Sequence, residues 1–321
     1  MRRPATRARC HSDHVIVVCG EAIVDLVPDP GDPVRFTATP GGSPANTAVA
    51  VARLGSRVGL MARLSRDGFG ALLRHHLAAN GVDLSAAVAA GEPSSVALAA
   101  IGPDGAAGYR FLVDGAADWQ WDDAELRRLP DAATAVHTGS LSLALAPGAA
   151  AIERMLLAAR HRCTLSLDPN IRPHLTHDLA ESRDTVERCV GIADVVKASA
   201  DDLAELYPGR APLDIAAEWA GAGPGLVVIT RGPAGAVGLT PDGVRVAFEA
   251  VVVPVVDTIG AGDSFAAGLL DWLARSERLG GRIGPMSAAD VEAALRFAAG
   301  CAAVTCSRRG ADPPWRREIE D

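Results

Sequence analysis

Cysteine pairs and long hydrophobic runs are both missing from the sequence. The chain of 321 residues has six cysteines, and no two of them form a Cys-x-x-Cys pair. Its first apolar run, Val15 to Cys19, is far shorter than the ~20 apolar residues of a membrane span, and too short for a secretory signal. We therefore expect reduced thiols, no zinc site, no membrane partner and a cytoplasmic protein.

Long blocks of one charge are also missing. The net charge of −8 comes from 31 basic and 39 acidic residues that are spread along the chain. Without a basic patch or tail, the sequence does not indicate nucleic acid or an anionic membrane as a partner. Because 49% of the residues are hydrophobic, the chain can bury a full core. The expected ligand is a small molecule.

Short Val, Ile and Leu runs alternate with Ala- and Leu-rich helical patterns along most of the chain. This alternation is typical of an α/β fold, with a mostly parallel sheet covered by helices on both faces. The predicted strands span residues 15–19, 57–62, 135–138, 164–168, 195–197, 226–230 and 236–239. The predicted helices span residues 46–54, 70–80, 149–160, 182–189, 200–206, 213–220, 264–275 and 288–306.

One region does not follow this alternation. Residues 34–39 and 95–113 have strand-like patterns, and a turn sequence at residues 102–105 predicts a hairpin outside any β-α-β unit. We expect a small sheet that folds over the main domain as a lid. Its outer face or edge is also a candidate dimer contact, and the sequence leaves monomer and homodimer open.

The sequence Asp257-Thr258-Ile259-Gly260-Ala261-Gly262-Asp263-Ser264-Phe265 follows an apolar run at residues 251–256 and precedes another at 266–273. It predicts a strand, a glycine-rich turn and the start of a helix. Free N–H groups at a helix N-terminus bind anions, and the two glycines let a phosphate approach the backbone. The alternative is an ordinary turn whose aspartate only complements the helix dipole.

Two upstream segments carry further polar residues. Asp25 follows the first predicted strand, where ligands bind in open α/β sheets, although it equally fits a simple loop carboxylate. The sequence Pro40-Gly41-Gly42-Ser43-Pro44-Ala45-Asn46 then leads into a helix. Paired glycines permit close approach of a ligand, and the Asn46 amide suits sugar hydroxyls. Helix capping explains Ser43 or Asn46 as well.

Together, the Gly-Gly-Ser-Pro-Ala-Asn segment, the Asp-Thr-Ile-Gly-Ala-Gly-Asp-Ser-Phe segment and the hairpin between them resemble the PfkB (ribokinase-like) carbohydrate kinases. The resemblance covers residues 15–314 as one kinase domain, with a disordered arm at 1–14 and a tail at 315–321. It implies a three-layer sandwich with a small β-sheet lid. Within the family the chain is most similar to bacterial fructokinases, through stretches that include residues 20–22, 117–119, 168–173, 196–199, 206–209 and 310–314.

The resemblance assigns the reacting groups and the sugar site. Asp263 is implied as the catalytic base for a sugar hydroxyl that attacks the γ-phosphate of ATP. Phosphoryl transfer mainly requires alignment and charge stabilisation, which the turn can supply. The phosphoryl oxygens would lie on the amides of Gly260, Ala261 and Gly262. The sugar site would be lined by Asp25, Gly41, Gly42, Asn46, Asn170 and Arg172.

The same resemblance implies a nucleotide site and two cations. ATP would contact Lys197, Ser199, Thr230, Arg231, Gly232 and Gly235, which follow predicted strands. Magnesium would lie on the phosphates, with Asp202 reached through water, because this ion dehydrates reluctantly. Asp257 matches a position that helps hold a monovalent cation, so potassium dependence is expected.

Three positions depart from the family pattern. Asp202 stands where the family usually has a longer Glu, and Ser65 stands where the first signature usually ends in Gly. Val113 replaces the Arg that meets the carboxylate in 2-keto-3-deoxygluconate kinases, which favours a neutral sugar. We therefore expect conversion of D-fructose to fructose 6-phosphate. The alternatives are a 2-keto-3-deoxygluconate kinase, a ribokinase, or a catalytically silent homologue that only binds sugar or nucleotide.

Overall fold

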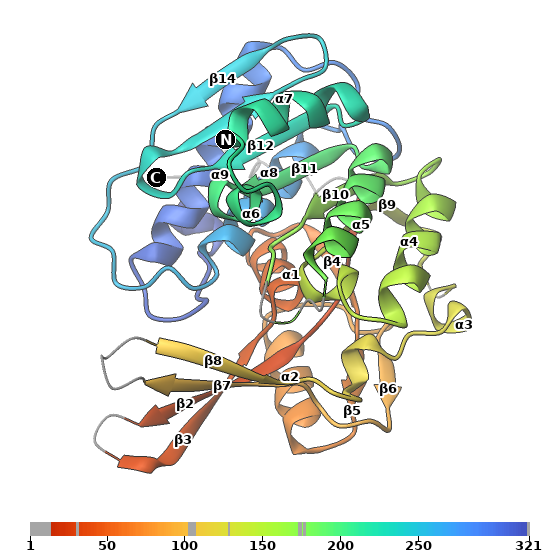
Figure 1. Ribbon diagram of the computed structural model, residues 1–321, viewed down its shortest axis with the longest axis vertical. Helices are drawn as coiled ribbons and strands as arrows, with labels where there is room; N and C mark the ends of the chain where they lie inside the picture. The colour runs from red at the N-terminus through yellow and green to blue at the C-terminus, as the bar shows by residue number, and fades with distance from the viewer. Residues whose placement is uncertain are drawn as a thin grey trace, which may run out of the picture.

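A mixed sheet forms the centre of the molecule (Figure 1). The computed structural model describes residues 14–29, 32–101, 107–127, 129–172, 175 and 178–319. Within these ranges, eight strands lie in the order β14-β13-β12-β11-β10-β9-β1-β4. Their bounds are β1 Val15–Cys19, β4 Arg57–Met61, β9 Ala133–Gly139, β10 Thr164–Asp168, β11 Val195–Ser199, β12 Leu226–Thr230, β13 Ala236–Leu239 and β14 Arg245–Phe248.

The strands from β4 to β12 pair in parallel, and β13 and β14 add an antiparallel edge. Consequently, the carboxyl ends of β1, β9, β10, β11 and β12 meet at one edge of the sheet. Their register places Asp168 beside Gly139 and Ser199 beside Thr230. Ligands of open α/β sheets bind at this edge.

Helices cover both faces, which confirms the predicted α/β sandwich. Alternate residues of a strand point to opposite faces. Ile16 and Val18 of β1 accordingly belong to one core cluster, and Val17 and Cys19 belong to the other. The first cluster packs under α1 (Ser43–Arg53), α2 (Gly68–Ala79), α8 (Ala261–Arg275) and α9 (Ala288–Cys306). The second packs under α3 (Asp123–Leu126), α4 (Gly148–Ala159), α5 (Leu179–Ile192), α6 (Ala200–Leu206) and α7 (Pro212–Ala222).

A separate small sheet projects from one end of the main domain (Figure 1). Its strands lie in the order β3-β2-β7-β8, with bounds β2 Ile23–Asp29, β3 Asp32–Gly41, β7 Val96–Ile101 and β8 Ala107–Leu112. The two predicted lid segments are part of this sheet, whereas the predicted turn at 102–105 and residues 1–13 of the arm predicted at 1–14 lie outside the described residues. A third, two-stranded sheet pairs β5 (Arg63–Ser65) with β6 (Val88–Ala90).

Strand β2 corrects the expected position of Asp25. This residue lies within β2, opposite Thr39 of β3, and not in a loop at the end of β1. The sequence concealed the strand because Asp and Pro are unfavourable in strands, and β2 contains Asp25, Pro28 and Asp29. The register shifts between Pro28 and Asp29, where the missing N–H of proline matters least.

The predicted strand at residues 251–256 is wrong. This apolar run is irregular, and Val252 is 95% exposed. Pro254 lacks the N–H that a ladder requires, and Val256 donates its N–H to the carbonyl of Cys306 at the end of α9 (2.8 Å). An apolar run therefore reaches the glycine turn without joining the sheet.

The C-terminal residues are anchored to the main domain. Arg316 Nε donates to the Leu54 carbonyl (2.7 Å), and the Arg316 guanidinium forms an ion pair with buried Asp271 of α8. Among the described helices, none is long and apolar enough to cross a membrane.

The contact between α8 and α9 depends on Gly268. A Cβ at this position would lie 2.7 Å from the Cα of Ala298, which is backbone and cannot move aside cheaply. We expect Gly268→Ala to destabilise the protein by about 1–3 kcal/mol through overpacking. Gly300→Ala in α9 is the matched control, because its Cβ would meet only ordinary contacts and should stabilise by about 0.5–1 kcal/mol. Urea unfolding measures both, and equal effects would contradict this packing.

Candidate active site

Asp263 lies in the first turn of α8, where it faces the N-terminus of α1. Ser43 Oγ donates to Asp263 Oδ1 across 2.6 Å, and Asn46 Nδ2 donates to Oδ2 across 2.9 Å. Both donors lie in the first turn of α1, three residues apart, so they share one helix face. The two segments that stood out in the sequence therefore meet at one carboxylate.

The environment of Asp263 works in two directions on its pKa. Burial raises the pKa, because the side chain is only 7% exposed and loses water around its charge. The hydrogen bonds from Ser43 and Asn46 stabilise the ionised form and lower it, as do the positive charges of Lys197 and Arg172. The net direction is upward, which is the direction expected of a carboxylate that accepts protons.

A buried ion pair lies beside Asp263. Lys197 of β11 donates from Nζ to Asp168 Oδ2 across 2.8 Å, and the two side chains are 6% and 2% exposed. Burial raises the pKa of Asp168 to about 6, although Lys197 opposes the shift. The Lys197 amine also lies 2.9 Å from the position that a Cβ of Gly262 would occupy. A glycine at 262 thus lets this positive charge lie against the N-terminus of α8.

The glycine turn is closed by the segment that follows α9. Gly260 has φ 75°, and a Cβ there would lie 2.7 Å from the Cβ of Ala311. Asp257 accepts hydrogen bonds from Ile259 N (3.1 Å) and Gly310 N (2.9 Å), so it joins the two loops. Ala261 N donates to the Thr258 carbonyl across 3.2 Å. That long bond must be shared or released if Ala261 is to bind an anion.

The loop after β10 is folded by Arg172. Its Nη1 donates to Asn170 Oδ1 (2.7 Å) and to the Ile171 carbonyl (3.0 Å), and Asn170 has φ 41°. Asp202 holds the same loop from α6, since its Oδ1 accepts from Ile171 N across 2.7 Å. Its Oδ2 accepts from Ser199 N and Oγ, which completes a capping box at the start of α6. Both oxygens of Asp202 are therefore used in local structure.

The predicted sugar-site residues Asp25, Gly41 and Gly42 lie where the small sheet joins α1. The carboxylate of Asp25 lies directly against Gly41, where any side chain would collide with it. Burial raises the pKa of Asp25 to about 6. Gly42 has φ 99° and caps α1, which explains the need for glycine at the entrance to this helix.

The predicted nucleotide residues lie along two adjacent strand ends. Ser199 and Thr230 are paired in register at the ends of β11 and β12. The turn that follows is closed by Arg231 N, which donates to the Gly235 carbonyl across 2.7 Å. Gly235 has φ 79°, and a side chain there would collide with the backbone after β14. Gly232 is exposed on this turn.

The described part of the chain contains no group of three or more His, Cys, Asp or Glu residues placed to hold a metal ion. Magnesium that binds together with a nucleotide is usually held mainly by phosphate and water. Asp202 fits such a role only through water, because its oxygens already accept hydrogen bonds.

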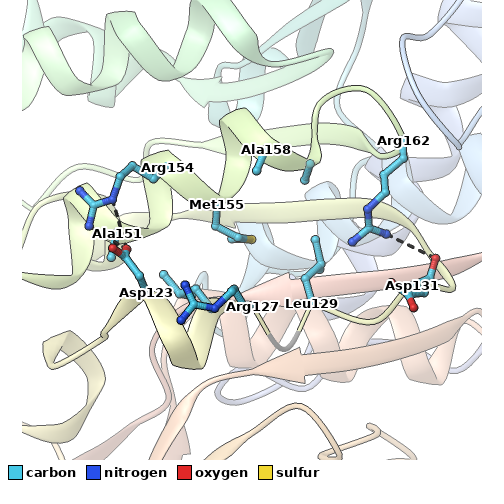
Figure 2. Close-up of a pocket in the computed structure, with 11 residues that line it drawn as sticks. Asp123, Arg127, Leu129, Asp131, Ala151, Arg154, Met155, Ala158 and Arg162 are labelled. Carbon is cyan, nitrogen blue, oxygen red and sulfur yellow. Dashed lines mark hydrogen bonds and ion pairs between the residues drawn. The ribbon is translucent and has the colours of Figure 1, made fainter.

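A groove of about 380 Å³ lies elsewhere, between α3 and α4 (Figure 2). Arg154 donates to Asp123 in this groove, and Arg162 donates to the carbonyls of Pro130 and Asp131. These charged groups are occupied by protein partners, and none of them comes from the carboxyl ends of the strands. The chemistry therefore indicates the edge near Asp263 as the candidate site.

Sequence reasoning did not assign roles to Ser43 and Asp168. Ser43 was open to interpretation as a helix cap, yet its hydroxyl contacts Asp263 instead. Asp168 carried a weak signal, since it is a charged residue that ends a fully buried strand. Such a residue lies at the ligand-binding edge of a parallel sheet, and that rule would have identified it.

The geometry agrees with a match between residues 13–317 and the model of the pfkB family carbohydrate kinases. The chain belongs to this family. It is therefore a carbohydrate kinase.

The individual relatives include fructokinases. A fructokinase of Rhizobium leguminosarum bv. trifolii is 36% identical over 80% of this chain and 78% of its own. The fructokinase of Xylella fastidiosa with bound ATP has a TM-score of 0.83 at 27% identity, over 95% and 96% of the two chains. A double mutant of the fructokinase of Vibrio cholerae, bound to fructose, ADP and potassium, has a TM-score of 0.78 at 29% identity, over 94% and 95%.

The buried pair allows a stability test. Lys197→Met leaves the Asp168 carboxylate buried without its partner, and we expect a loss of about 3 kcal/mol in the free energy of unfolding. The double variant Lys197→Met/Asp168→Asn should recover most of this loss. Arg210→Ala breaks an exposed ion pair with Glu218 and should change stability little. Urea unfolding of the wild type and the three variants checks this. A double variant with a lower free energy of unfolding than Lys197→Met would contradict the pairing.

Proposed function

We propose that the protein phosphorylates D-fructose at the expense of ATP, giving fructose 6-phosphate and ADP. The observation that carries this proposal is the convergence of Ser43, Asn46 and Lys197 on Asp263 at the N-terminus of α8. The relatives named fructokinase support the choice of sugar.

Asp263 acts as the general base. The 6-hydroxyl of the sugar transfers its proton to the carboxylate as its oxygen attacks the γ-phosphorus, and the bond between that phosphorus and the bridging oxygen of ADP breaks. The base needs one free lone pair, and each carboxylate oxygen retains one beside its hydrogen bond from Ser43 or Asn46. These two donors fix the direction of the carboxylate before the sugar arrives.

The transferred phosphoryl group lies at the start of α8. Amides of Gly260, Ala261 and Gly262 bind its oxygens, and the helix dipole adds positive potential there. Lys197 and Arg172 supply charge from the neighbouring strand end and loop. Magnesium bound with ATP would neutralise phosphate charge, and Asp202 would hold it through water. ATP extends along Ser199 and Thr230 to the turn of Arg231, Gly232 and Gly235.

Asp257 supports a monovalent cation site. Its carboxylate joins the loop before α8 to the loop after α9 through Ile259 N and Gly310 N. A potassium ion near these loops would stabilise the glycine turn electrostatically, and a Vibrio cholerae relative is described with potassium bound. The carbonyl and carboxylate oxygens at hand suit such a hard cation.

The sugar lies between the small sheet and α1. Asp25, Gly41, Gly42, Asn46, Asn170 and Arg172 line its site, and the small sheet acts as a lid that excludes water from the phosphate. Val113, which leaves β8, offers no positive charge to a sugar acid. A neutral hexose therefore fits better than a sugar acid.

Removal of the base tests the mechanism. We expect Asp263→Asn to lower kcat by about 10²–10⁴-fold, the usual contribution of a general base. Circular dichroism and a melting curve establish that the variant is folded. Asp214→Asn, which changes an exposed carboxylate in the first turn of α7, is the matched control and should retain wild-type turnover. A folded Asp263→Asn enzyme with near wild-type kcat would contradict the role of Asp263 as general base.

The pH profile tests the contact with Ser43. This hydrogen bond stabilises ionised Asp263, so Ser43→Ala should raise the pKa of Asp263 further. Less base is then ionised at a given pH, and the acidic limb of kcat/KM should move to higher pH. Ser182→Ala, at a half-buried position in α5 where the hydroxyl donates to the Asp178 carbonyl, should leave the limb in place. A Ser43→Ala limb that stays put or moves to lower pH contradicts this assignment.

Substrate identity is tested by ATP consumption in a coupled assay with fructose, ribose, glucose, 2-keto-3-deoxygluconate and adenosine. The proposal expects the highest kcat/KM with fructose. If a sugar acid is used and fructose is not, the fructokinase assignment is overturned. If ATP binds and no sugar elicits turnover, the protein is a silent sugar- or nucleotide-binding homologue.

A further inference from the structure

The chain passes four times between the main domain and the small sheet, and all four crossings lie together (Figure 1). They are the residues before β2, between β3 and α1, before β7 and after β8. At the second crossing, a Cβ of Gly42 would lie 2.9 Å from the Glu21 carbonyl, which belongs to the first. Ala117 N donates to the Pro93 carbonyl across 2.9 Å, which joins the fourth crossing to the third.

Asp118 connects three of these crossings through one carboxylate. It lies in a short 3-10 helix, η1 (Ala117–Trp119), which follows β8. Asp118 Oδ1 accepts from Ala22 N across 2.9 Å, immediately before β2. Asp118 Oδ2 accepts from Ser95 Oγ across 2.6 Å, immediately before β7. The residues that precede the two parallel central strands of the small sheet thus donate to the same carboxylate.

The helix that carries Asp118 is held by the main domain. Arg63 of β5 donates from Nε to the Ala117 carbonyl across 3.0 Å, and its guanidinium pairs with Glu92 and Glu125. Trp119 is buried and donates from Nε1 to the Val113 carbonyl across 3.0 Å. The Asp118 carboxylate therefore links the starts of β2 and β7 to a helix that Arg63 holds.

Burial makes these hydrogen bonds important. Asp118 is 1% exposed, Ser95 is fully buried and Ala22 is 2% exposed, so water cannot replace a lost partner. Burial raises the pKa of Asp118 to about 7, and the nearby carboxylate of Glu21 raises it too. Glu21 itself accepts a hydrogen bond from Ser142 Oγ. Asp118 joins both strand starts by side-chain hydrogen bonds, beside the backbone bond from Val24 N to the Ser95 carbonyl (3.0 Å).

We propose that Asp118 is a positioning residue of the small sheet, whose carboxylate fixes the starts of β2 and β7 and so sets the place of Asp25 over the sugar. Asp25 is three residues beyond Ala22, and the register pairs it with Ala97 of β7, two residues beyond Ser95. A shift of either strand start therefore moves Asp25 directly. The effect on the sugar rests on the proposed kinase function, whereas the effect on the strands does not.

The test compares Asp118→Ala with Asp118→Asn. Alanine leaves Ala22 N and Ser95 Oγ buried without partners, while asparagine can accept from Ala22 N and donate to Ser95 Oγ. We expect Asp118→Ala to raise KM for the sugar about tenfold, the scale of a lost buried hydrogen bond, with kcat changed far less. ATP hydrolysis without sugar should also rise. Asp118→Asn should restore both values.

Asp194→Ala is the matched control. Asp194 is also 1% exposed and accepts a hydrogen bond from Leu165 N across 2.7 Å. It lies immediately before β11, however, at the amino end of that strand. It should lower the melting temperature by a similar amount with wild-type KM. An equal rise of KM in Asp194→Ala, or no restoration by Asp118→Asn, would overturn the positioning role.

Hydrogen–deuterium exchange gives a readout that does not depend on turnover. Peptides that cover β2 and β7 should exchange faster in Asp118→Ala than in the wild type. In Asp194→Ala their exchange rate should equal that of the wild type. If the wild type phosphorylates no sugar, the proposed function fails, and this exchange still decides the role of Asp118. Unchanged exchange in Asp118→Ala would refute it.

Discussion

The hydrogen bonds from Ser43 and Asn46 to the Asp263 carboxylate are the interaction on which the site depends. They join side chains 220 and 217 positions apart in the sequence, at the N-termini of two different helices. Because α1 continues from the small sheet and α8 continues from the glycine turn, this contact brings the proposed sugar-binding segment to the proposed phosphate-binding turn. Without it, each segment is an ordinary glycine-containing entry into a helix.

The charged side chains around this contact each have a partner, either an opposite charge or hydrogen-bond donors. Asp168 and Lys197 form a buried pair, and Asp202 uses both oxygens to hold the loop of Ile171 and the start of α6. A buried carboxylate is costly unless hydrogen bonds and opposite charges stabilise it. In the proposed mechanism Lys197 also serves the reaction, since it lies against Gly262, where phosphate charge would be stabilised.

Much of the fold followed from sequence periodicity, and the failures have physical causes. The strand at Thr164–Asp168 and the helix at Ala288–Cys306 have the predicted bounds, because each has an uninterrupted pattern and clear ends. Strand β2 was not predicted because Asp25 and Pro28 are unfavourable in strands. It is stabilised by pairing with β3 and β7, which its own residues do not reveal. The apolar run at 251–256 was wrongly predicted as a strand, since apolar content does not supply a partner strand.

The site was predictable in its parts but not in its contacts. The phosphate turn and the Asn46 segment are recognisable from residue types, whereas the meeting of Asp263 with Ser43 is a long-range contact. The role proposed for Asp118 was equally out of reach, because nothing local links it to Ala22 and Ser95.

In the proposed mechanism, Asp263 takes a proton and never a phosphoryl group. A carboxylate at a phosphate-binding turn has a second possible chemistry, in which it attacks ATP and forms an aspartyl phosphate. Stereochemistry at phosphorus separates the two routes most directly, with ATP made chiral at the γ-phosphate by oxygen isotopes and the sugar phosphate analysed by ³¹P NMR. One direct in-line transfer to the sugar predicts inversion of configuration. Retention would show two successive transfers and would contradict the role of Asp263 as a base.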